Sequence, residues 1–528
     1  MGWISCLLAL TLLSASVLGT ETVKINDGQL AGSLDGTTAI HSFKGIPFAA
    51  PPVGELRWQP PQPVQPWSGV RDATQFANRS MQNPIYSDMK FRSSGVSEDS
   101  LYLNVWTPAE VTKQKLPVLL YFYGGGFIAG AADERRYDGA SMAQQDIVVV
   151  TANYRLGVFG FFAHPQLSAQ TDYHGSGNYS LLDQQAALQW VVNNIQAFGG
   201  DPKRITIGGE SAGSISVSAL LASPMSRDLI GGAIGQSGSI VGPPIDTMSL
   251  ADAQAQGEKL QVALMGDNSA HSFMALRHMP ADELLAKATA AGFTYFRPNI
   301  DGYFLPVSPL TIYQNGQHGD VPLLVGDNSQ EGSYQQILDG QEPTPQNYQW
   351  ALKRLYPQHH AQVAALYPAK DSGEVMAAAQ ALASDRFMGF ATWNWIDLAS
   401  AHNKKPSYYY FYDHIRPVSK EQQEVAGQPQ PTPLGAVHSA EIEYALGNLQ
   451  VNPLYQWQAD DHLVSSLMQQ YFANFIKQGD PNGQSLVNWP RFSQGKRLVI
   501  NRSPHVQEMA PLHARYLFHR QYYTAQEQ

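Results

Sequence analysis

The residues of this sequence best suited to do chemistry are a serine and its small neighbours, in the run ITIGGESAGSI at 205–215. Gly209 and Gly213 flank Ser211 in the pattern Gly-x-Ser-x-Gly. A short apolar run leads into the motif, and small and apolar residues follow it. A serine on a sharp turn between a strand and a helix presents its hydroxyl at the edge of a sheet. The motif therefore indicates acyl transfer through a serine nucleophile, and the alternative is a glycine-rich turn with an incidental serine.

A serine nucleophile also needs donors for the oxyanion that forms on the substrate. The run YGGGF at 123–127 follows the apolar run 116–123, and its three glycines let bare N–H groups turn toward one point. The residue after the nucleophile commonly supplies a further donor. We therefore expect an oxyanion hole made by the N–H groups of Gly125, Gly126 and Ala212. The alternative is a flexible loop.

The elements that must position these groups alternate along the centre of the chain. Apolar runs predict strands at 116–123, 145–154, 204–207 and 321–327. Helical spacing predicts helices at 181–198, where Gly199 and Gly200 end the pattern, and at 212–222. Alternating strands and helices with apolar strands predict an α/β fold with a mostly parallel sheet covered on both faces.

Two stretches rich in proline lie outside this pattern. Residues 47–66 read as an ordered, extended wrap over the surface, because Trp58 and Trp67 need burial. Residues 421–433 read as an exposed loop. Neither has the character of a linker between domains.

The composition is that of a globular protein. Of the 528 residues, 43% are hydrophobic and 15% are charged, which allows a large core. The formal net charge of −10 argues against nucleic-acid binding, because phosphates would be repelled. The sequence shows no cluster of His, Cys and carboxylates with ligand spacing, so we expect no metal and no other cofactor.

The first residues are those of a secretory leader. WISCLLALTLLSASVLG at 3–19 is apolar and ends in small residues, with Val17 and Gly19 placed for cleavage after Gly19. We expect a signal peptide at 1–19, a secreted or periplasmic protein, and no later membrane span. The alternatives are a membrane anchor or a buried first helix. The single cysteine, Cys6, lies in this leader, so the mature chain would form no disulfide.

Several longer motifs resemble the type-B carboxylesterase family, which includes the cholinesterases. They are FKGIPFAAPPVGELRWQPPQP (43–63), SEDSLYLNVWTP (97–108), YGGGF, NYRLGVFGF and GNYSLLDQQAALQWVVNNIQAFGGDP. The resemblance covers nearly the whole chain after the leader. It implies an α/β-hydrolase fold with large helical insertions, one catalytic domain at 20–528, and hydrolysis of small-molecule carboxylic esters.

The resemblance also places the partners of the nucleophile. In the family order of nucleophile, acid and histidine, the acid falls on Glu331 in GDNSQEG (326–332) and the base on His438 in LGAVHSAEIEY (434–444). Glu331 should stay ionised, because its task is to orient the imidazole and stabilise the imidazolium. Asp327 is the rival acid.

Other charged and polar residues take supporting places in the same resemblance. Glu210 and Glu441 would tune the histidine through water, and Ser237 would hydrogen-bond the acid. Two buried ion pairs are implied as fold staples, Arg57 with Glu98 and Arg155 with Asp183.

Departures from the family limit the substrate. In cholinesterases the matching stretch is a disulfide loop with a tryptophan that stacks on the choline cation. Residues 76–96 contain neither cysteine nor tryptophan, so a choline ester is doubtful. The acyl and alcohol pockets should lie on insertions such as 268–300 and 340–400, and we expect short or aromatic acyl groups. The rival functions are a non-catalytic, esterase-like surface binding protein, and a lactonase or amidase with the same triad. The sequence leaves the oligomeric state open. Sequons occur at Asn78, Asn178 and Asn501.

Overall fold

The structure is a computed structural model that describes residues 21–109, 115–419 and 433–526. The predicted leader at 1–19, with Cys6, lies outside the described residues. So does nearly all of the stretch 421–433, for which the sequence predicted an exposed loop.

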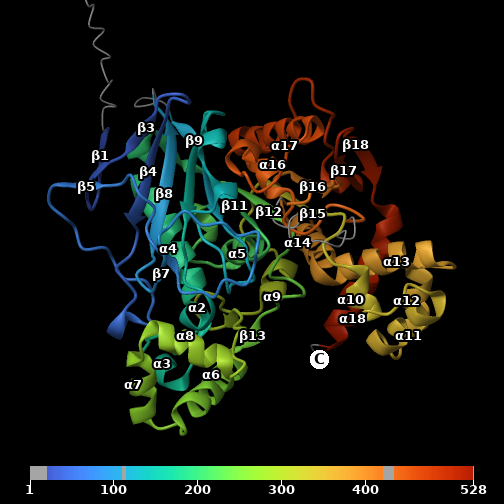
Figure 1. Cartoon of the computed structure of the whole chain (residues 1–528), viewed down its shortest axis with the longest axis horizontal. Coiled ribbons are helices and arrows are strands. Elements are labelled where there is room, and N and C mark those ends of the chain that lie inside the picture. The colour runs from blue at the N-terminus through green and yellow to red at the C-terminus, as the bar shows by residue number, and fades with distance from the viewer. Residues whose placement is uncertain (1–20, 110–114, 420–432, 527–528) are drawn as a thin grey trace, which may run out of the picture.

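The described residues form a large mixed sheet flanked by helices (Figure 1). Within them, this sheet has eleven strands in the order β18-β17-β16-β15-β12-β11-β9-β10-β8-β4-β3. From one edge, the strands are β18 (His505–Glu508), β17 (Lys496–Ile500), β16 (Ser407–Tyr412), β15 (Leu323–Asn328), β12 (Gly232–Gln236), β11 (Gly200–Glu210), β9 (Leu116–Phe122), β10 (Val148–Ala152), β8 (Tyr102–Pro108), β4 (Ile40–Pro47) and β3 (Ser33–Asp35). The strands from β17 to β10 run parallel, and both edges are antiparallel.

The predicted α/β architecture is therefore confirmed, and its boundaries shift for physical reasons. Every residue of β9 is buried, as its apolar run predicted. β10 begins at Val148 rather than 145, because Gln145 and Asp146 belong to a turn after a short helix. β11 begins earlier than the predicted 204, because Gly200 already pairs with Leu116 of β9.

The helices beside the sheet lie where the pattern placed them. α5 (Ala212–Ala222) has the predicted bounds and contacts β9, β11 and β12. The predicted helix 181–198 appears as α4 (Tyr179–Asn194) followed by a 3₁₀ turn, Ile195–Phe198. Gly199 ends it with φ of +81°, a conformation that suits glycine.

The remaining elements cover the sheet or build the insertions. The first insertion holds α6 (Leu250–Met265), α7 (Ala270–His278) and α8 (Ala281–Ala290). The second holds α10 (Tyr334–Leu338), α11 (Pro345–Leu355), α12 (His360–Leu366), α13 (Ser372–Ser384) and α14 (Phe390–Ser400). The other helices are α1 (Ala140–Ala143), α2 (Gly157–Phe161), α3 (Pro165–Ser168), α9 (Pro309–Gln314), α16 (Ile442–Leu446), α17 (Ala459–Gln478) and α18 (Ala510–Gln526). The short strands are β1 (Thr22–Ile25), β2 (Gly28–Ala31), β5 (Val70–Asp72), β6 (Arg79–Ser80), β7 (Val96–Ser97), β13 (Met248–Ser249) and β14 (Asn299–Ile300).

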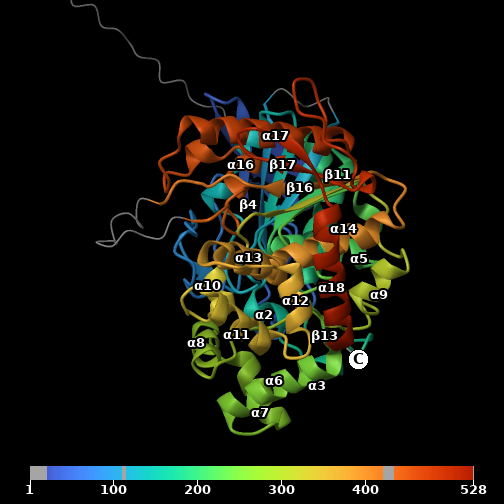
Figure 2. The ribbon, with the colours of Figure 1, turned by 90° about the vertical axis from the view of Figure 1, so that its right-hand side faces the viewer.

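The C-terminal helix α18 joins the second insertion to the rest of the molecule. Figure 2 shows α18 in red, running alongside the gold helices of that insertion. Phe518 of α18 belongs to the small hydrophobic core of α10–α13, which is separate from the main core around the sheet. α18 is thus part of the frame that holds this insertion.

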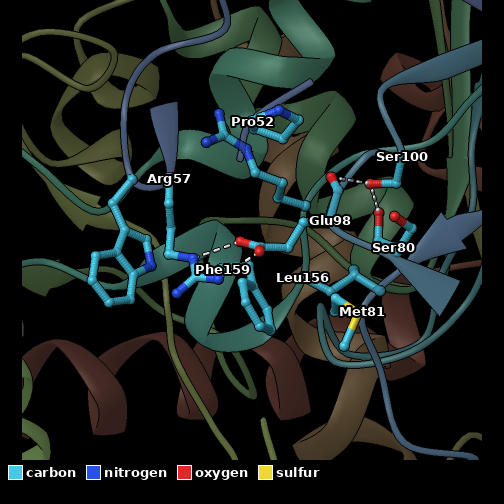
Figure 3. Close-up of a pocket in the computed structure, with 11 residues that line it drawn as sticks. Pro52, Arg57, Ser80, Met81, Glu98, Ser100, Leu156 and Phe159 are labelled. Carbon is cyan, nitrogen blue, oxygen red and sulfur yellow. Dashed lines mark hydrogen bonds and ion pairs between the residues drawn. The ribbon is translucent and has the colours of Figure 1, made fainter. Parts of the chain in front are cut away.

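The proline-rich wrap is ordered and is fastened by a buried ion pair. Trp58 is buried and its indole N–H donates to the carbonyl of Val158 at 2.8 Å. Trp67 is only partly buried. Arg57 and Glu98 form two parallel contacts, Nε to Oε1 at 2.6 Å and Nη2 to Oε2 at 2.5 Å (Figure 3). Bidentate pairs of this kind fix geometry as well as charge, so the wrap is tied to the segment before β8.

A second buried ion pair joins β10 to α4. Arg155 donates to Asp183 through Nε at 2.8 Å and through Nη2 at 2.7 Å. Both side chains are almost fully buried. This pair fixes the start of α4 against the segment that follows β10. None of the helices in the described ranges combines the length and the apolar character that a membrane crossing requires.

Candidate active site

Ser211 occupies the turn between β11 and α5. α5 begins at Ala212, as predicted, whereas β11 runs on to Glu210, three residues beyond the predicted end at 207. Ser211 has φ of +56° and ψ of −121°, a strained conformation for a residue with a side chain. A Cβ on Gly213 would collide with the carbonyl of Phe122, so the motif needs its glycines for close approach.

His438 and Glu331 lie in line with this serine. The imidazole Nε2 of His438 is 3.0 Å from Oγ of Ser211, and its Nδ1 is 2.5 Å from Oε2 of Glu331. Because a carboxylate only accepts, Nδ1 carries the proton and Nε2 faces the serine hydroxyl. A bridge between Gln330 and Val437 joins the two loops that carry these residues. The structure thus brings the three predicted residues together.

Glu331 is held by two further donors. Its Oε1 accepts from the hydroxyl of Ser237 at 2.5 Å and from the backbone N–H of Asn328 at 2.6 Å. The rival acid Asp327 instead accepts from the hydroxyl of Tyr409, at 2.6 Å. Successive residues of a strand point to opposite faces, so Asp327 and Asn328 of β15 face different sides of the sheet.

Glu210 lies beside the same imidazole. Its Oε1 is 3.3 Å from Nε2 of His438, and the side chain is almost fully buried. Burial raises the pKa of Glu210, and the imidazolium of His438 opposes that shift, so the charge on Glu210 is coupled to the charge on His438. Burial alone would lower the pKa of His438, but the carboxylates of Glu210 and Glu331 outweigh it and raise that pKa to about 9. The two carboxylates therefore stabilise the imidazolium when it forms.

Glu441 is linked to the site through two side-chain amides. Its carboxylate accepts from the side-chain amides of Asn328 at 2.6 Å and Gln236 at 3.3 Å. Burial and the nearby charge of Glu331 raise its pKa to about 7. Asn328 and Gln236 were missed by the sequence reasoning. The available signal was that Gln236 precedes Ser237 and that Asn328 ends the strand before the acid.

The glycine-rich loop lies next to the serine. Gly125 and Gly126 have φ of +110° and +62°, which only glycine adopts readily. Among the hydrogen bonds of the described residues, none uses the amide N–H of Gly125, Gly126 or Ala212. Ala212 is the first residue of α5, where an N–H has no partner in the helix. The three amides are thus left to serve another acceptor.

Gln82, which the sequence analysis also missed, fastens this loop. Its side-chain amide donates to the carbonyl of Gly130 at 2.8 Å and accepts from the N–H of the same residue at 2.9 Å. Gly125 and Gly126 lie in the chain between Gly130, which this clamp holds, and the end of β9. The loop is therefore held at both ends.

Residues 19–516 match the family model described as the carboxylesterase family. The chain belongs to this family. It is 34% identical over 490 residues to the fumonisin B1 esterase of Sphingopyxis macrogoltabida, covering 90% of this chain and 86% of that protein. It is 34% identical to a cocaine esterase of Oryctolagus cuniculus (91% and 92% covered) and to the pyrethroid hydrolase Ces2e of Rattus norvegicus (94% and 90% covered). The carboxylesterase thus has the α/β-hydrolase fold, and it hydrolyses small-molecule carboxylic esters.

The carboxylesterase holds a cavity of about 330 Å³ against Ser211 and His438. Its wall includes side chains from the stretch 76–96, from both insertions and from the segment between β12 and β13: Tyr86, Asp88, Tyr295, Phe387, Met388 and Ile245. The sequence placed the pockets on the insertions without naming these residues. Their positions depend on turns and helix contacts that no spacing in the sequence reveals. Across the described part of this carboxylesterase, no three His, Cys, Asp or Glu side chains gather as a metal site would need.

Proposed function

We propose that Ser211 is the nucleophile of ester hydrolysis, that His438 is its general base, and that Glu331 orients the imidazole. The observation that carries this proposal is the line of contacts from Oγ of Ser211 through both ring nitrogens of His438 to Glu331, at 3.0 and 2.5 Å. A nucleophile, a base and an orienting acid at these distances are what acyl transfer by serine requires.

The reaction follows from these contacts. His438 accepts the proton of Ser211 as the oxygen attacks the ester carbonyl, and the C=O becomes an oxyanion facing Gly125, Gly126 and Ala212. When the tetrahedral intermediate collapses, His438 gives its proton to the departing alcohol. Water then attacks the acyl-enzyme with the same base, and the acid is released. The positive end of α5 adds to the stabilisation of the oxyanion.

The supporting acids act on the imidazolium that forms in each step. Glu331 stabilises it from the Nδ1 side, with Ser237 fixing the carboxylate. Glu210 stabilises it from the Nε2 side, at 3.3 Å. Glu441 acts at longer range through Asn328, which also donates a backbone hydrogen bond to Glu331.

The preferred ester has a short or aromatic acyl group. A cavity of about 330 Å³ is at the small end of ligand pockets, and Phe387, Tyr86 and Tyr295 line it with rings. The described residues of 76–96 offer no tryptophan for a choline cation. A panel of p-nitrophenyl esters of rising acyl length, beside aryl, feruloyl and choline esters, tests this. A preference for long chains would contradict it.

The chain is a secreted or periplasmic enzyme with a signal peptide at 1–19 and one catalytic domain at 20–528. The apolar leader and its small residues at 17 and 19 support this. In a eukaryotic secretory pathway, Asn178 would be a poor glycan acceptor. Its side chain is buried and bonded to both backbone groups of Asn299, at 2.8 and 3.0 Å. N-terminal sequencing of the exported protein tests the cleavage after Gly19.

Titration with an organophosphonate tests the nucleophile directly. We expect one adduct per chain, on Ser211, with loss of activity in proportion. The variant Ser211→Ala should form none. Absence of any adduct on the wild-type protein would favour a surface binding protein instead. Parallel assays on lactones and anilides separate an esterase from a lactonase or amidase with the same triad.

A further inference from the structure

The second insertion contains a π-helical turn at the wall of the ester cavity. Residues Asp385–Gly389 form this turn between α13 and α14. A π turn holds one residue more than an α turn, and such turns are rare and concentrated at functional sites. Phe387 and Met388 from this turn line the cavity. The ring of Phe387 meets the ring of His438 edge to face, with centroids 5.1 Å apart.

On its other side, the π turn is held by a buried polar cluster, which we call the Asp385 cluster: Tyr367, Asp385, Arg515 and His519. Asp385 is only 4% exposed. Its Oδ2 accepts from Nε and Nη2 of Arg515 at 2.8 and 2.5 Å, and from the hydroxyl of Tyr367 at 2.5 Å. The carboxylate at the start of the π turn is thus fixed by charge and by geometry.

His519 completes the cluster from α18. Its Nε2 is 2.8 Å from the hydroxyl oxygen of Tyr367, and its side chain is fully buried. Burial lowers the pKa of His519 to about 4, so the ring is neutral. Because Tyr367 gives its proton to Asp385, Nε2 of His519 must be the donor to Tyr367. The hydrogen bonds therefore run in one direction, from α18 to the π turn.

Other contacts between α18 and α14 lie beyond the π turn. Tyr516 stacks on Trp393, and Arg520 reaches Asp397 at 2.7 Å. The pair of Arg520 with Asp397 also links α18 to the second insertion, but through α14, and both of its side chains are about one-third exposed. It touches no residue of the π turn, so it provides a matched control for the Asp385 cluster.

We propose that Asp385 is a positioning residue, and that the Asp385 cluster holds the π turn so that Phe387 and Met388 set the acyl-group selectivity of the ester cavity. Without the cluster, a buried charge loses its partner and the turn relaxes toward α-helix. When the extra residue of the π turn is taken into the regular α-helical register, the residues after it rotate by about 100° about the helix axis. The aromatic wall beside His438 then moves. The proposal rests on the proposed function, since it needs the ester to be bound against His438.

The test compares Asp385→Asn and Arg515→Gln with Arg520→Gln. For each variant, kcat/KM is measured on p-nitrophenyl acetate and p-nitrophenyl hexanoate, and Tm is recorded. We expect the ratio of the two kcat/KM values to change by about tenfold in both cluster variants, because small displacements of substrate-positioning groups have effects of this size. The direction should match that of Phe387→Ala, and Arg515→Lys should restore part of the ratio. Arg520→Gln should lower Tm while leaving the ratio within twofold of wild type.

A milder variant keeps the proposal falsifiable if the cluster variants do not fold. Tyr367→Phe removes one hydrogen bond to Asp385 and keeps the ion pair with Arg515, and it should change the ratio by about threefold, because a hydrogen bond to a charged group is lost. An unchanged ratio in Tyr367→Phe and in the folded cluster variants overturns the proposal. So does an unchanged ratio in Phe387→Ala, or an equal change in Arg520→Gln.

The phosphonate adduct separates this failure from failure of the proposed function. Each folded variant is titrated for its adduct on Ser211. A full adduct with unchanged selectivity overturns the role of the Asp385 cluster alone. A wild-type protein without the adduct overturns the proposed function, and with it this proposal.

Discussion

Oε1 of Glu210 lies 3.3 Å from Nε2 of His438, the same nitrogen that faces Oγ of Ser211 at 3.0 Å. The imidazole is therefore in contact with carboxylates through both of its nitrogens, since Glu331 meets Nδ1. In the proposed acyl transfer, these contacts would stabilise the imidazolium on two sides. The same contacts make the histidine a stronger base, and they raise the pH at which it becomes neutral.

Removal of the Glu210 charge should shift the pH profile to lower pH. His438 must be neutral to accept the serine proton, so kcat/KM falls as the pH drops below its pKa. Burial lowers this pKa, and the carboxylates of Glu210 and Glu331 raise it to about 9. Glu210→Gln removes one of them, so the acid limb of kcat/KM should move down by about 1 unit. Glu508→Gln, at an exposed pair with Lys496, is the control. A limb that stayed in place or moved up would contradict the role of Glu210.

Loss of the serine hydroxyl should nearly abolish turnover. Ser211→Ala removes the oxygen that is proposed to form the acyl-enzyme, and we expect kcat on p-nitrophenyl acetate to fall by roughly 10⁶. The fold should survive, because Ala removes only one oxygen from a turn whose glycines are unchanged. Circular dichroism and Tm check this. A variant that kept a tenth of the wild-type activity would rule out Ser211 as the nucleophile.

A methyl group on the oxyanion loop should slow the chemistry more than it destabilises the fold. In Gly126→Ala, the added Cβ meets no atom closer than 3.7 Å, but φ of +62° strains any side chain. The loop should shift and misplace its amide donor, so we expect kcat to fall by about 10². Gly302→Ala, with φ of +74° and open space around it, is the control for strain alone. Equal activity in the two variants would remove Gly126 from the oxyanion hole.

Buried and exposed ion pairs in this chain should differ in how much they contribute to the free energy of unfolding. Arg155→Met leaves Asp183 buried without its partner, and the free energy of unfolding should fall by about 3–5 kcal/mol. Arg502→Met breaks an exposed pair with Asp460 and should cost under about 1 kcal/mol. Thermal unfolding followed by circular dichroism compares them. Similar losses in both would show that the buried pair is not a staple of the fold.

The parts of the fold that follow from local pattern could be predicted from the sequence. β9 and α5 are defined by their own residues, an apolar run and a run of small residues after the Gly-x-Ser-x-Gly turn, and they appear where predicted. β11 extends to Gly200 because a neighbouring strand pairs with it, and pairing is not encoded in the strand itself. A strand boundary that is set by pairing with a neighbouring strand therefore cannot be predicted from the segment alone.

The residues of the candidate site likewise fall into those with a local sequence signal and those without one. The turn at Ser211 and the glycine loop carry their own signals, whereas Glu331 and His438 were assigned only through the resemblance to a family. The bridge between Gln330 and Val437, which draws their loops together, leaves no mark in the sequence. Phe387 reaches the cavity through a π turn held by a distant helix, so the identity of that side chain alone could not place it.

The long separations within the site have a consequence for the enzyme while it is being made. His438 is 107 residues beyond Glu331 and 227 beyond Ser211, and α18, the last helix described, contacts the segment that carries Phe387. On the ribosome, the serine emerges long before its imidazole. The contacts of Ser211 and Glu331 with His438 therefore cannot form in a nascent chain until residue 438 has left the ribosome.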